Sequence, residues 1–558
     1  MKKYSKYLIV FGLVALSAGA CKKADFVEAN TDPKTLYSIL PKEQYLNAVI
    51  RIHNTDFEWY YDNYRRIMPW MQYLTPQNGN AVSFLQDIGN FNQRYGNFYN
   101  NVGNALEDVI ELINQSPDAA AMEYMKQVAI ITQAQYAFYV SEINGSIPYT
   151  QAFRARYENL LTPEYDTQEQ IFTIVDQELK NAITVLKTPQ AVTQESFGVH
   201  DQYYKGDFAK WIKAANALRL RIATRLEKRN PARMKEIALE VLADAGNLMT
   251  SNTDNWAFVT PAAFSSGGNW NPEIQRAPKP IVDFMWDKSD PRLRLYYAPN
   301  NYTQANFDLA KAQNKLGASA VFNPRRFIGG FTSPDASTNP ANAAFYNLTR
   351  TINVNGTVTT LDTLSQIQRR LFQPAFNGGT GTHYFPVITY SEFAFTRAEL
   401  AAKGVTTENA ATLYEAGVRA SIELYNTIAQ AAQIPEFVAV APAEVDTYLG
   451  QPDIAYNPAK GVEQIAVQAY LHYYKQPNEG WSLWKRTGMP NQNTLLSLPQ
   501  FLANGVVQPL PRRAQIRNPS ITSLNYENEK AAVDAMATGE GFGQGPSDMF
   551  GRVWWDKP

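Results

Sequence analysis

Cysteine is almost absent from this chain: its 558 residues include one, Cys21. A single cysteine excludes an intramolecular disulfide, so the fold must be stable without one. Histidine is also scarce. The four histidines are far apart and lack metal-ligand spacing: His53, His200, His383 and His472. We therefore expect no histidine-based zinc site, no other metal site and no cofactor.

Charged residues are also few. Charged residues make up 18% of the chain, and 51 basic and 52 acidic side chains leave a net charge of −1 with no long run of either sign. This balance argues against nucleic acid, or an anionic membrane surface, as the main partner. Hydrophobic residues make up 45%, which is enough for a large core. After Leu16, no apolar run approaches the roughly 20 residues that cross a bilayer.

The first 21 residues predict a secreted, lipid-anchored protein. Lysines at positions 2, 3 and 6 precede the apolar run Leu8–Leu16, and small residues then lead to Cys21. The run is too short to span a membrane and is typical of a signal peptide, residues 1–20. The lone cysteine after small residues resembles a bacterial lipobox, in which the cysteine is acylated. The alternative is ordinary cleavage near Ala20, with an incidental cysteine.

Beyond residues 21–42, which we interpret as a lipidated tether and entry segment, we expect one α-rich domain over residues 43–558. Thr167 and Gln170 have capping-box spacing, and Asp207 opens an amphipathic helix whose apolar stripe leaves Arg221, Arg225 and Lys228 largely on the opposite side. Paired helices suggest a tetratricopeptide-like scaffold without a parallel sheet. Apolar periodicity predicts helices over residues 44–74, 101–115, 119–144, 167–187, 207–229, 234–245, 391–403, 410–432 and 462–476.

Two segments lack this periodicity. Residues 250–388 are rich in Asn, Gly, Pro and Ser, with short β-like pieces such as 357–361, and residues 490–558 are irregular. A long stretch of this kind within a compact protein is usually functional or folded onto another part. We therefore expect 250–388 to be a loop-rich insertion that carries a ligand-binding region.

No catalytic signature is present. The chain has no G-x-S-x-G, H-E-x-x-H or G-x-x-x-x-G-K-[ST] motif. Asp283, Asp287 and Asp290 cluster near Trp286 and could imitate a glycosidase carboxylate pair, although this spacing is more typical of a solvated helix face. We predict that the protein is not an enzyme.

Aromatic residues are abundant, at 13% of the chain. Aromatic faces and short polar groups together suit a sugar, and loops on a rigid scaffold are where such groups gather. We expect Trp270 to be exposed, because Gly, Ser and Asn residues flank it. The alternative is that most of the candidate tryptophans pack the loops onto the helices, and we expect this for at least half of them. The candidate ligand-binding residues are Trp270, Trp256, Trp286, Trp70, Tyr73 and Asn78.

Several passages together resemble the SusD/RagB family of nutrient-binding outer-membrane lipoproteins. No passage is decisive alone, but their order along some 500 residues is specific, most closely to the SusD-like subgroup that ends in W-W-D. The passages are Gly145–Tyr149 with Tyr165–Glu169, Trp211 with Ala215–Arg221, Pro386–Tyr390 with Glu392, Glu479–Gly488, Arg512-Arg513, and Arg552–Asp556.

The resemblance implies tetratricopeptide-like helix pairs that support an irregular ligand-binding face. It also implies a lipid-anchored protein on the outside of the outer membrane, which captures a glycan and delivers it to a SusC-like TonB-dependent transporter without catalysis. Other family members bind peptides, so a peptide ligand stays open. Two further alternatives are a lipid-anchored polysaccharide hydrolase and a helical scaffold that only assembles envelope proteins.

Overall fold

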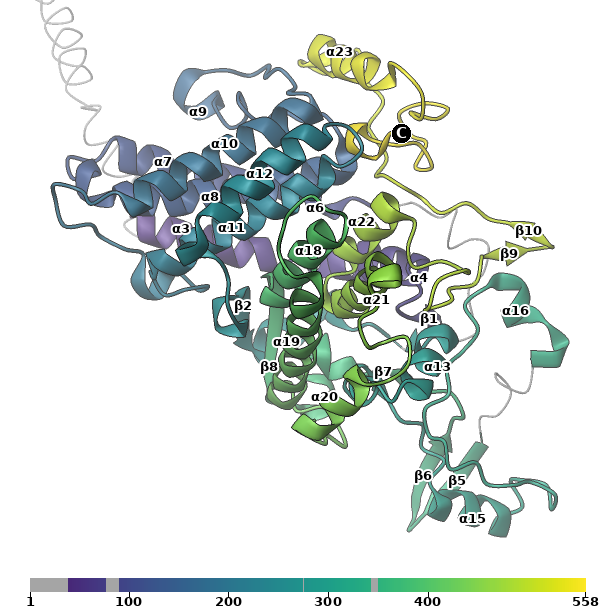
Figure 1. The fold of residues 1–558 in the computed structure, drawn as a ribbon. Coiled ribbons are helices and arrows are strands. Elements are labelled where there is room, and N and C mark those ends of the chain that lie inside the picture. The colour runs from purple at the N-terminus through teal and green to yellow at the C-terminus, as the bar shows by residue number, and fades with distance from the viewer. Residues whose placement is uncertain (1–38, 77–89, 274, 343–349) are drawn as a thin grey trace, which may run out of the picture.

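The computed structural model describes residues 39–76, 90–273, 275–342 and 350–558 (Figure 1). Cys21 and Asn78 lie outside these ranges. Within them, a large hydrophobic cluster extends from Tyr45 to Trp555. No helix in the described ranges combines the length and apolar character needed to cross a membrane.

The long helices in the first half of the chain pack in pairs: α3 with α7, α7 with α8, α8 with α10, α10 with α11, and α11 with α12 (Figure 1). This arrangement confirms the helices predicted within 101–144, 167–187 and 207–229. The helical stretch predicted over 44–74, with a break near Pro69, is divided earlier as well, into α3, a π-helix at Glu58–Ile67 and the short α4. The helices are α3 (Pro41–His53), α4 (Met68–Trp70), α6 (Gln93–Asn97), α7 (Gly103–Asn114), α8 (Glu123–Asn144), α9 (Ala155–Glu158), α10 (Gln168–Lys187), α11 (Phe208–Arg225) and α12 (Pro231–Ala243).

Side-chain caps mark where α10 and α11 begin. At the start of α10, the Gln170 backbone N–H donates to Thr167 Oγ1 at 3.3 Å, and the Thr167 N–H donates to Gln170 Oε1 at 2.8 Å, which confirms the capping box. At the start of α11, Asp207 Oδ1 accepts from two backbone N–H groups at 3.0 and 3.2 Å. Each cap satisfies amides that have no partner within the helix.

Helix α11 is covered on both sides, so its polar side does not face solvent. Arg221 and Arg225 are 5% exposed, and their guanidinium groups reach Glu392 of α18 (Tyr390–Ala402) and Glu142 of α8. The 3.6-residue pattern locates the apolar stripe but contains no information on what covers the opposite side. The polar side of α11 is therefore an ion-pair interface between helices.

The second helical group follows the irregular region. The predicted helices over 391–403, 410–432 and 462–476 are present, with the last one shorter, but α23 lies in a segment that the sequence predicts to be irregular. The helices are α18 (Tyr390–Ala402), α19 (Ala410–Ala431), α20 (Pro442–Leu449), α21 (Gly461–His472), α22 (Pro477–Thr487) and α23 (Tyr526–Ala537).

A short segment near residue 555 closes the first helical group. Trp555 is 1% exposed; its indole N–H donates to the Glu142 carbonyl of α8 at 2.8 Å, and its backbone N–H donates to the Gln168 side chain of α10 at 3.0 Å. The side chain therefore acts as a wedge that joins two helices more than 380 residues earlier in the chain.

Residues 250–388 contain more regular structure than their composition predicts. The strand pairs of the described residues are antiparallel: β2 pairs with β8, β5 pairs with β6, β9 pairs with β10, and one small sheet has the order β1-β3-β7-β4. The predicted β piece at 357–361 is confirmed as β6. The strands are β1 (Thr75–Pro76), β2 (Trp256–Pro261), β3 (Gln275–Arg276), β4 (Tyr297–Ala298), β5 (Arg350–Val354), β6 (Thr357–Leu361), β7 (Gln366–Ile367), β8 (Thr382–Ile388), β9 (Leu502–Ala503) and β10 (Val506–Val507).

The described part of this region also contains helices, and part of it forms a small lobe. The lobe contains α15, β5 and β6, projects from the main body in Figure 1, and has its own cluster of Ala310, Ile352 and Leu361. The helices are α13 (Lys279–Asp287), α14 (Leu293–Tyr296), α15 (Gln304–Ala312) and α16 (Pro334–Thr338).

Candidate functional site

The expectation that Trp270 is exposed is wrong: its side chain is 4% exposed. The ring packs edge-on against Phe385 of β8, with centroids 5.6 Å apart, and Tyr64 donates to the Trp270 carbonyl at 3.3 Å. The Gly- and Ser-rich flanks do indicate a loop. However, this loop folds onto the β2–β8 pair, so the indole fills the core.

Three other aromatic candidates are also buried. Trp256 is 0% exposed and meets Trp211 of α11 at 5.0 Å between centroids; Tyr73 is 1% exposed and stacks on Tyr470 at 4.5 Å. Trp70 is 1% exposed, although its side chain lines a cavity near α22. The alternative interpretation, that most of these side chains pack loops onto helices, is therefore confirmed.

Trp286 is the candidate with an accessible ring, at 42% exposed. The Arg325 guanidinium lies over it, 5.0 Å from the ring centroid, and Phe327 is 6.4 Å away. Of the nearby acids, Asp283 pairs with Lys279 and Arg325, whereas Asp290 is buried in an ion pair with Arg292. Because cations engage both carboxylates, the cluster does not resemble a free acid and base pair.

The π-helix at Glu58–Ile67 carries a second aromatic group, on its outer face. We call Phe57, Tyr60 and Tyr61 the aromatic patch. Phe57 is 51% exposed and stacks with Tyr61 at 5.7 Å between centroids, and Tyr60 meets Tyr61 edge-on at 5.0 Å. π-Helical turns are uncommon and frequently occur at functional sites.

Polar groups border the aromatic patch. The Tyr60 hydroxyl donates to Glu273 at 2.8 Å, and the Arg65 guanidinium lies 4.4 Å from the Tyr60 ring centroid. Partial burial, followed by the hydrogen bond to Glu273, raises the pKa of Tyr60, so this hydroxyl remains a donor at neutral pH. Asp56 fixes the neighbouring loop by accepting from the Asn269 backbone N–H at 3.0 Å.

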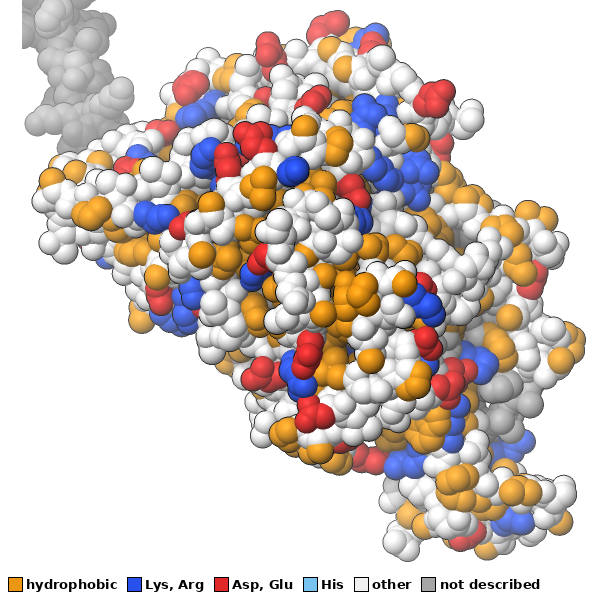
Figure 2. Space-filling model, in the orientation of Figure 1, with side chains coloured by type: hydrophobic (Ala, Val, Ile, Leu, Met, Phe, Trp, Pro, Cys, Tyr) orange, Lys and Arg blue, Asp and Glu red, His pale blue; other side chains and the backbone are white. Residues whose placement is uncertain are grey.

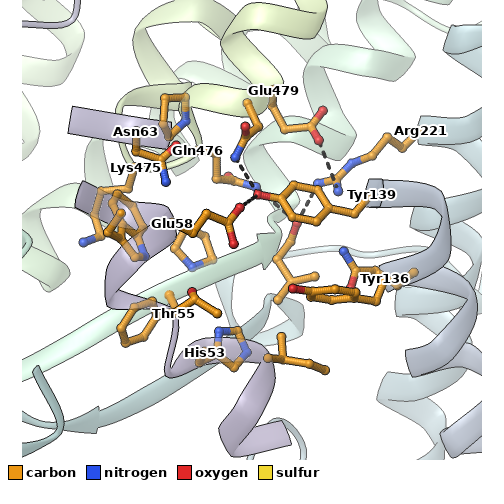
Figure 3. Close-up of a pocket in the computed structure, with 18 residues that line it drawn as sticks. His53, Thr55, Glu58, Asn63, Tyr136, Tyr139, Arg221, Lys475, Gln476 and Glu479 are labelled. Carbon is orange, nitrogen blue, oxygen red and sulfur yellow. Dashed lines mark hydrogen bonds and ion pairs between the residues drawn. The ribbon is translucent and has the colours of Figure 1, made fainter. Parts of the chain in front are cut away.

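The inner face of the same helix lines a cavity of about 110 Å³ (Figure 3). Glu58 points toward Tyr139 of α8, accepts a hydrogen bond from its hydroxyl, and pairs with Arg94 at 3.6 Å. At about 30 Å³ per water, this space suits a few solvent molecules, whereas small-molecule sites have about 300–1,000 Å³. The cavity is therefore too small for an oligosaccharide.

Burial controls the protonation of two residues that line this cavity. It lowers the pKa of Lys475 to about 7 and that of His53 to about 3. Lys475 donates to the Leu371 carbonyl and lies 4.8 Å from the Phe372 ring centroid. Within the described residues, no group of three or more His, Cys, Asp or Glu side chains could hold a metal.

Sequence reasoning missed the aromatic patch because it favoured tryptophans in loops. A signal was present, since five of the eight residues Phe57–Tyr64 are aromatic. Helical periodicity alone would place such a run in the core. The π-helix instead directs Trp59 and Tyr64 inward and leaves Phe57, Tyr60 and Tyr61 at the surface.

Comparisons with known proteins agree on one family. The model described as "Starch-binding associating with outer membrane" matches residues 36–513. A chitin-binding protein superposes with a TM-score of 0.68 at 22% identity, covering 93% of this chain and 100% of its own. A SusD homologue from Bacteroides fragilis NCTC 9343 gives 0.66 at 18% identity, covering 93% and 100%.

A chitin-binding SusD homologue from Flavobacterium johnsoniae gives a TM-score of 0.65 at 19% identity, covering 93% of this chain and 98% of its own. The comparison with curated proteins finds no match. At these identities the superpositions show a shared fold, whereas the family model covers most of the sequence. The chain therefore belongs to the SusD-like family.

Proposed function

We propose that the protein is a cell-surface nutrient-binding lipoprotein that captures a glycan and does not catalyse a reaction. The observation that carries the proposal is the aromatic patch. The exposed ring of Phe57 and the half-buried rings of Tyr60 and Tyr61 suit the C–H face of a sugar, and Arg65 and Glu273 beside them suit its hydroxyl groups. The chitin-binding descriptions of two structural neighbours support the same class of ligand.

The proposal extends to location and partner. The family description associates its members with the outer membrane. An acylated Cys21 would hold the protein on the outer face of that membrane, and a SusC-like TonB-dependent transporter would receive the glycan. Acidic and basic side chains are interspersed over the face in Figure 2. That face therefore has no large region of one charge that would favour a charged ligand over a neutral glycan.

The test is calorimetric titration of the detergent-solubilised protein with chitohexaose, maltohexaose and a neutral hexapeptide. Tyr60→Ala together with Tyr61→Ala should weaken glycan binding by ~1–3 kcal/mol, the scale of losing aromatic contacts at a binding site. Tyr157→Ala is the matched control. Like Tyr60, Tyr157 donates to a carboxylate, that of Asp108, and lies beneath a guanidinium, that of Arg156 at 5.6 Å.

Unchanged glycan affinity in the Tyr60/Tyr61 variant would remove the aromatic patch from the site. Binding of the peptide in place of both glycans would favour the peptide-binding alternative. Turnover of either glycan would contradict the proposal that the protein is not an enzyme.

A further inference from the structure

A cavity of about 350 Å³ lies away from the aromatic patch, between α4, α22 and the loop that leads to β9 and β10. Its described lining contains no Asp, Glu, Lys, Arg or His side chain. We call it the amide-lined cavity, because six of its lining residues are Asn or Gln: Gln72, Asn491, Gln492, Asn493, Gln500 and Gln508.

The apolar part of the amide-lined cavity is rigid. Trp70 and Phe501 are 1% and 3% exposed, so both side chains are anchored in the core. Trp484 of α22 is half-buried, and the Arg512 guanidinium lies 4.8 Å from its ring centroid. Arg512 is not part of the cavity lining, and Asp556 neutralises it at 2.6 Å. An aromatic wall is therefore held in place without adding charge to the cavity.

The amides divide into two groups. Gln72, Asn491 and Gln508 hold the loop, because their side-chain N–H groups donate to the carbonyls of Pro499, Gly488 and Val506 at 2.9, 2.9 and 3.1 Å. Gln492, Asn493 and Gln500 are exposed, and their side chains form no hydrogen bond within the described residues. One group thus shapes the cavity, and the other leaves donors and acceptors available to a ligand.

This chemistry selects an uncharged, hydroxyl-rich ligand. Each free amide offers both a donor and an acceptor, as a sugar hydroxyl does. A carboxylate, phosphate or ammonium would enter the cavity without a counter-ion, which is costly. By contrast, a cavity of about 360 Å³ beside Trp554 is lined by charged side chains of both signs: Arg229, Arg552, Lys557, Glu169 and Glu540. Volume in both cases falls within the range of small-molecule sites.

We propose that the amide-lined cavity is a second binding site, separate from the aromatic patch, that takes one end or one short stretch of an uncharged oligosaccharide. Trp484 stacks on a sugar ring, and Gln492, Asn493 and Gln500 exchange hydrogen bonds with its hydroxyls. The site stands on its own lining and does not depend on ligand binding at Tyr60 and Tyr61.

The experiment is fluorine NMR of the full chain in detergent, with its ten tryptophans replaced by 5-fluorotryptophan. A Trp484→Phe variant assigns the Trp484 resonance. Chitohexaose or maltohexaose should shift this resonance, both in the unaltered protein and in the Tyr60→Ala/Tyr61→Ala variant, whereas hexagalacturonate, an acidic probe, should not. If the Trp484 shift persists in that variant, the amide-lined cavity binds the glycan independently of the aromatic patch. This result would hold whether or not the proposed function of the aromatic patch is correct.

A second variant tests the amides without disturbing the core. Gln492→Ala with Gln500→Ala changes two exposed side chains. It should raise the dissociation constant measured from the Trp484 resonance about tenfold. The control is Trp554→Ala, another half-buried tryptophan beneath a guanidinium, that of Arg229 at 5.7 Å. The proposal is overturned if neither neutral hexasaccharide shifts Trp484, if hexagalacturonate shifts it equally, or if the Tyr60/Tyr61 variant loses the shift.

Discussion

Arg221 of α11 and Glu392 of α18 form a two-pronged ion pair, with Nε–Oε1 and Nη2–Oε2 distances of 2.6 and 2.7 Å, although 171 residues separate them. Both side chains are buried. Burial alone would lower the pKa of Arg221, but the negative charges of Glu392 and Glu479 outweigh it and raise this pKa, so the guanidinium stays protonated. The pair therefore fastens the first helical group to the second. Sequence order alone gives no indication of this connection.

Removing one side chain of that pair should strongly lower the free energy of unfolding. Arg221→Ala leaves a buried carboxylate without its main partner, which typically costs ~3–5 kcal/mol. Urea unfolding should show this loss. Arg419→Ala is the comparison: Arg419 pairs with Glu415 and Asp446 at the surface, and its removal should cost about 0.5 kcal/mol. Equal losses in the two variants would contradict the assigned role of Arg221.

Trp270→Ala should lower stability. Since the indole is 4% exposed and packs on Phe385, its removal leaves a cavity, and the expected loss in the free energy of unfolding is ~3–5 kcal/mol. Trp286→Ala, at 42% exposed, should cost about 1 kcal/mol or less. Thermal unfolding of the two variants side by side distinguishes them, and a Trp270 variant that melts like the unaltered protein would show that this ring is not part of the core.

Buried histidines should make the fold sensitive to acid. Burial lowers the pKa of His53 to about 3 from the usual 6.5, so between pH 6.5 and 3 the unfolded chain binds a proton that the folded protein does not. Stability therefore falls as pH falls through this window. His53→Gln should reduce the slope of unfolding free energy against pH by up to ~1.4 kcal/mol per pH unit.

His472, whose pKa burial also lowers to about 3, provides a parallel variant in His472→Gln. Each variant should show the same change in slope when urea unfolding is followed at several pH values. Slopes identical to that of the unaltered protein in both variants would rule out these histidines as the source of acid sensitivity.

Membrane attachment can be tested at Cys21, which lies outside the described residues. Cys21→Ser removes the proposed acylation site, so the variant should leave the outer-membrane fraction and remain folded. Fractionation followed by a high-salt wash measures this. Retention of the variant after the wash would mean that another contact anchors the protein.

The sequence predicts helices well here because their signals are local. The Thr167–Gln170 capping box and the apolar stripe of α11 both depend on residues within a few turns of one another. The prediction that Trp270 is exposed is wrong, and the burial of Arg221 is not predicted at all, for the opposite reason. Their burial depends on β8 and on α18, more than 110 residues further along the chain, and composition near the residue does not report such contacts.

The candidate site was harder to predict than the scaffold. In sequence, the aromatic patch of Phe57, Tyr60 and Tyr61 looks like a group of core aromatic residues. The difference is that no other part of the described structure covers it completely. That depends on the extra width of a π-helical turn and on the loop around Glu273, neither of which leaves a periodic signal.

The contacts of Trp555 with α8 and α10 can form only after the chain has been synthesised as far as residue 555. Its indole N–H reaches a carbonyl 413 residues earlier, so α8 and α10 stay without this contact while the ribosome and the export machinery deliver the intervening chain. Closing so long a loop comes late, after the local helix pairs have formed. Until then the parts of α8 and α10 that Trp555 covers lack this cover, which makes the incomplete chain a substrate for chaperones and proteases.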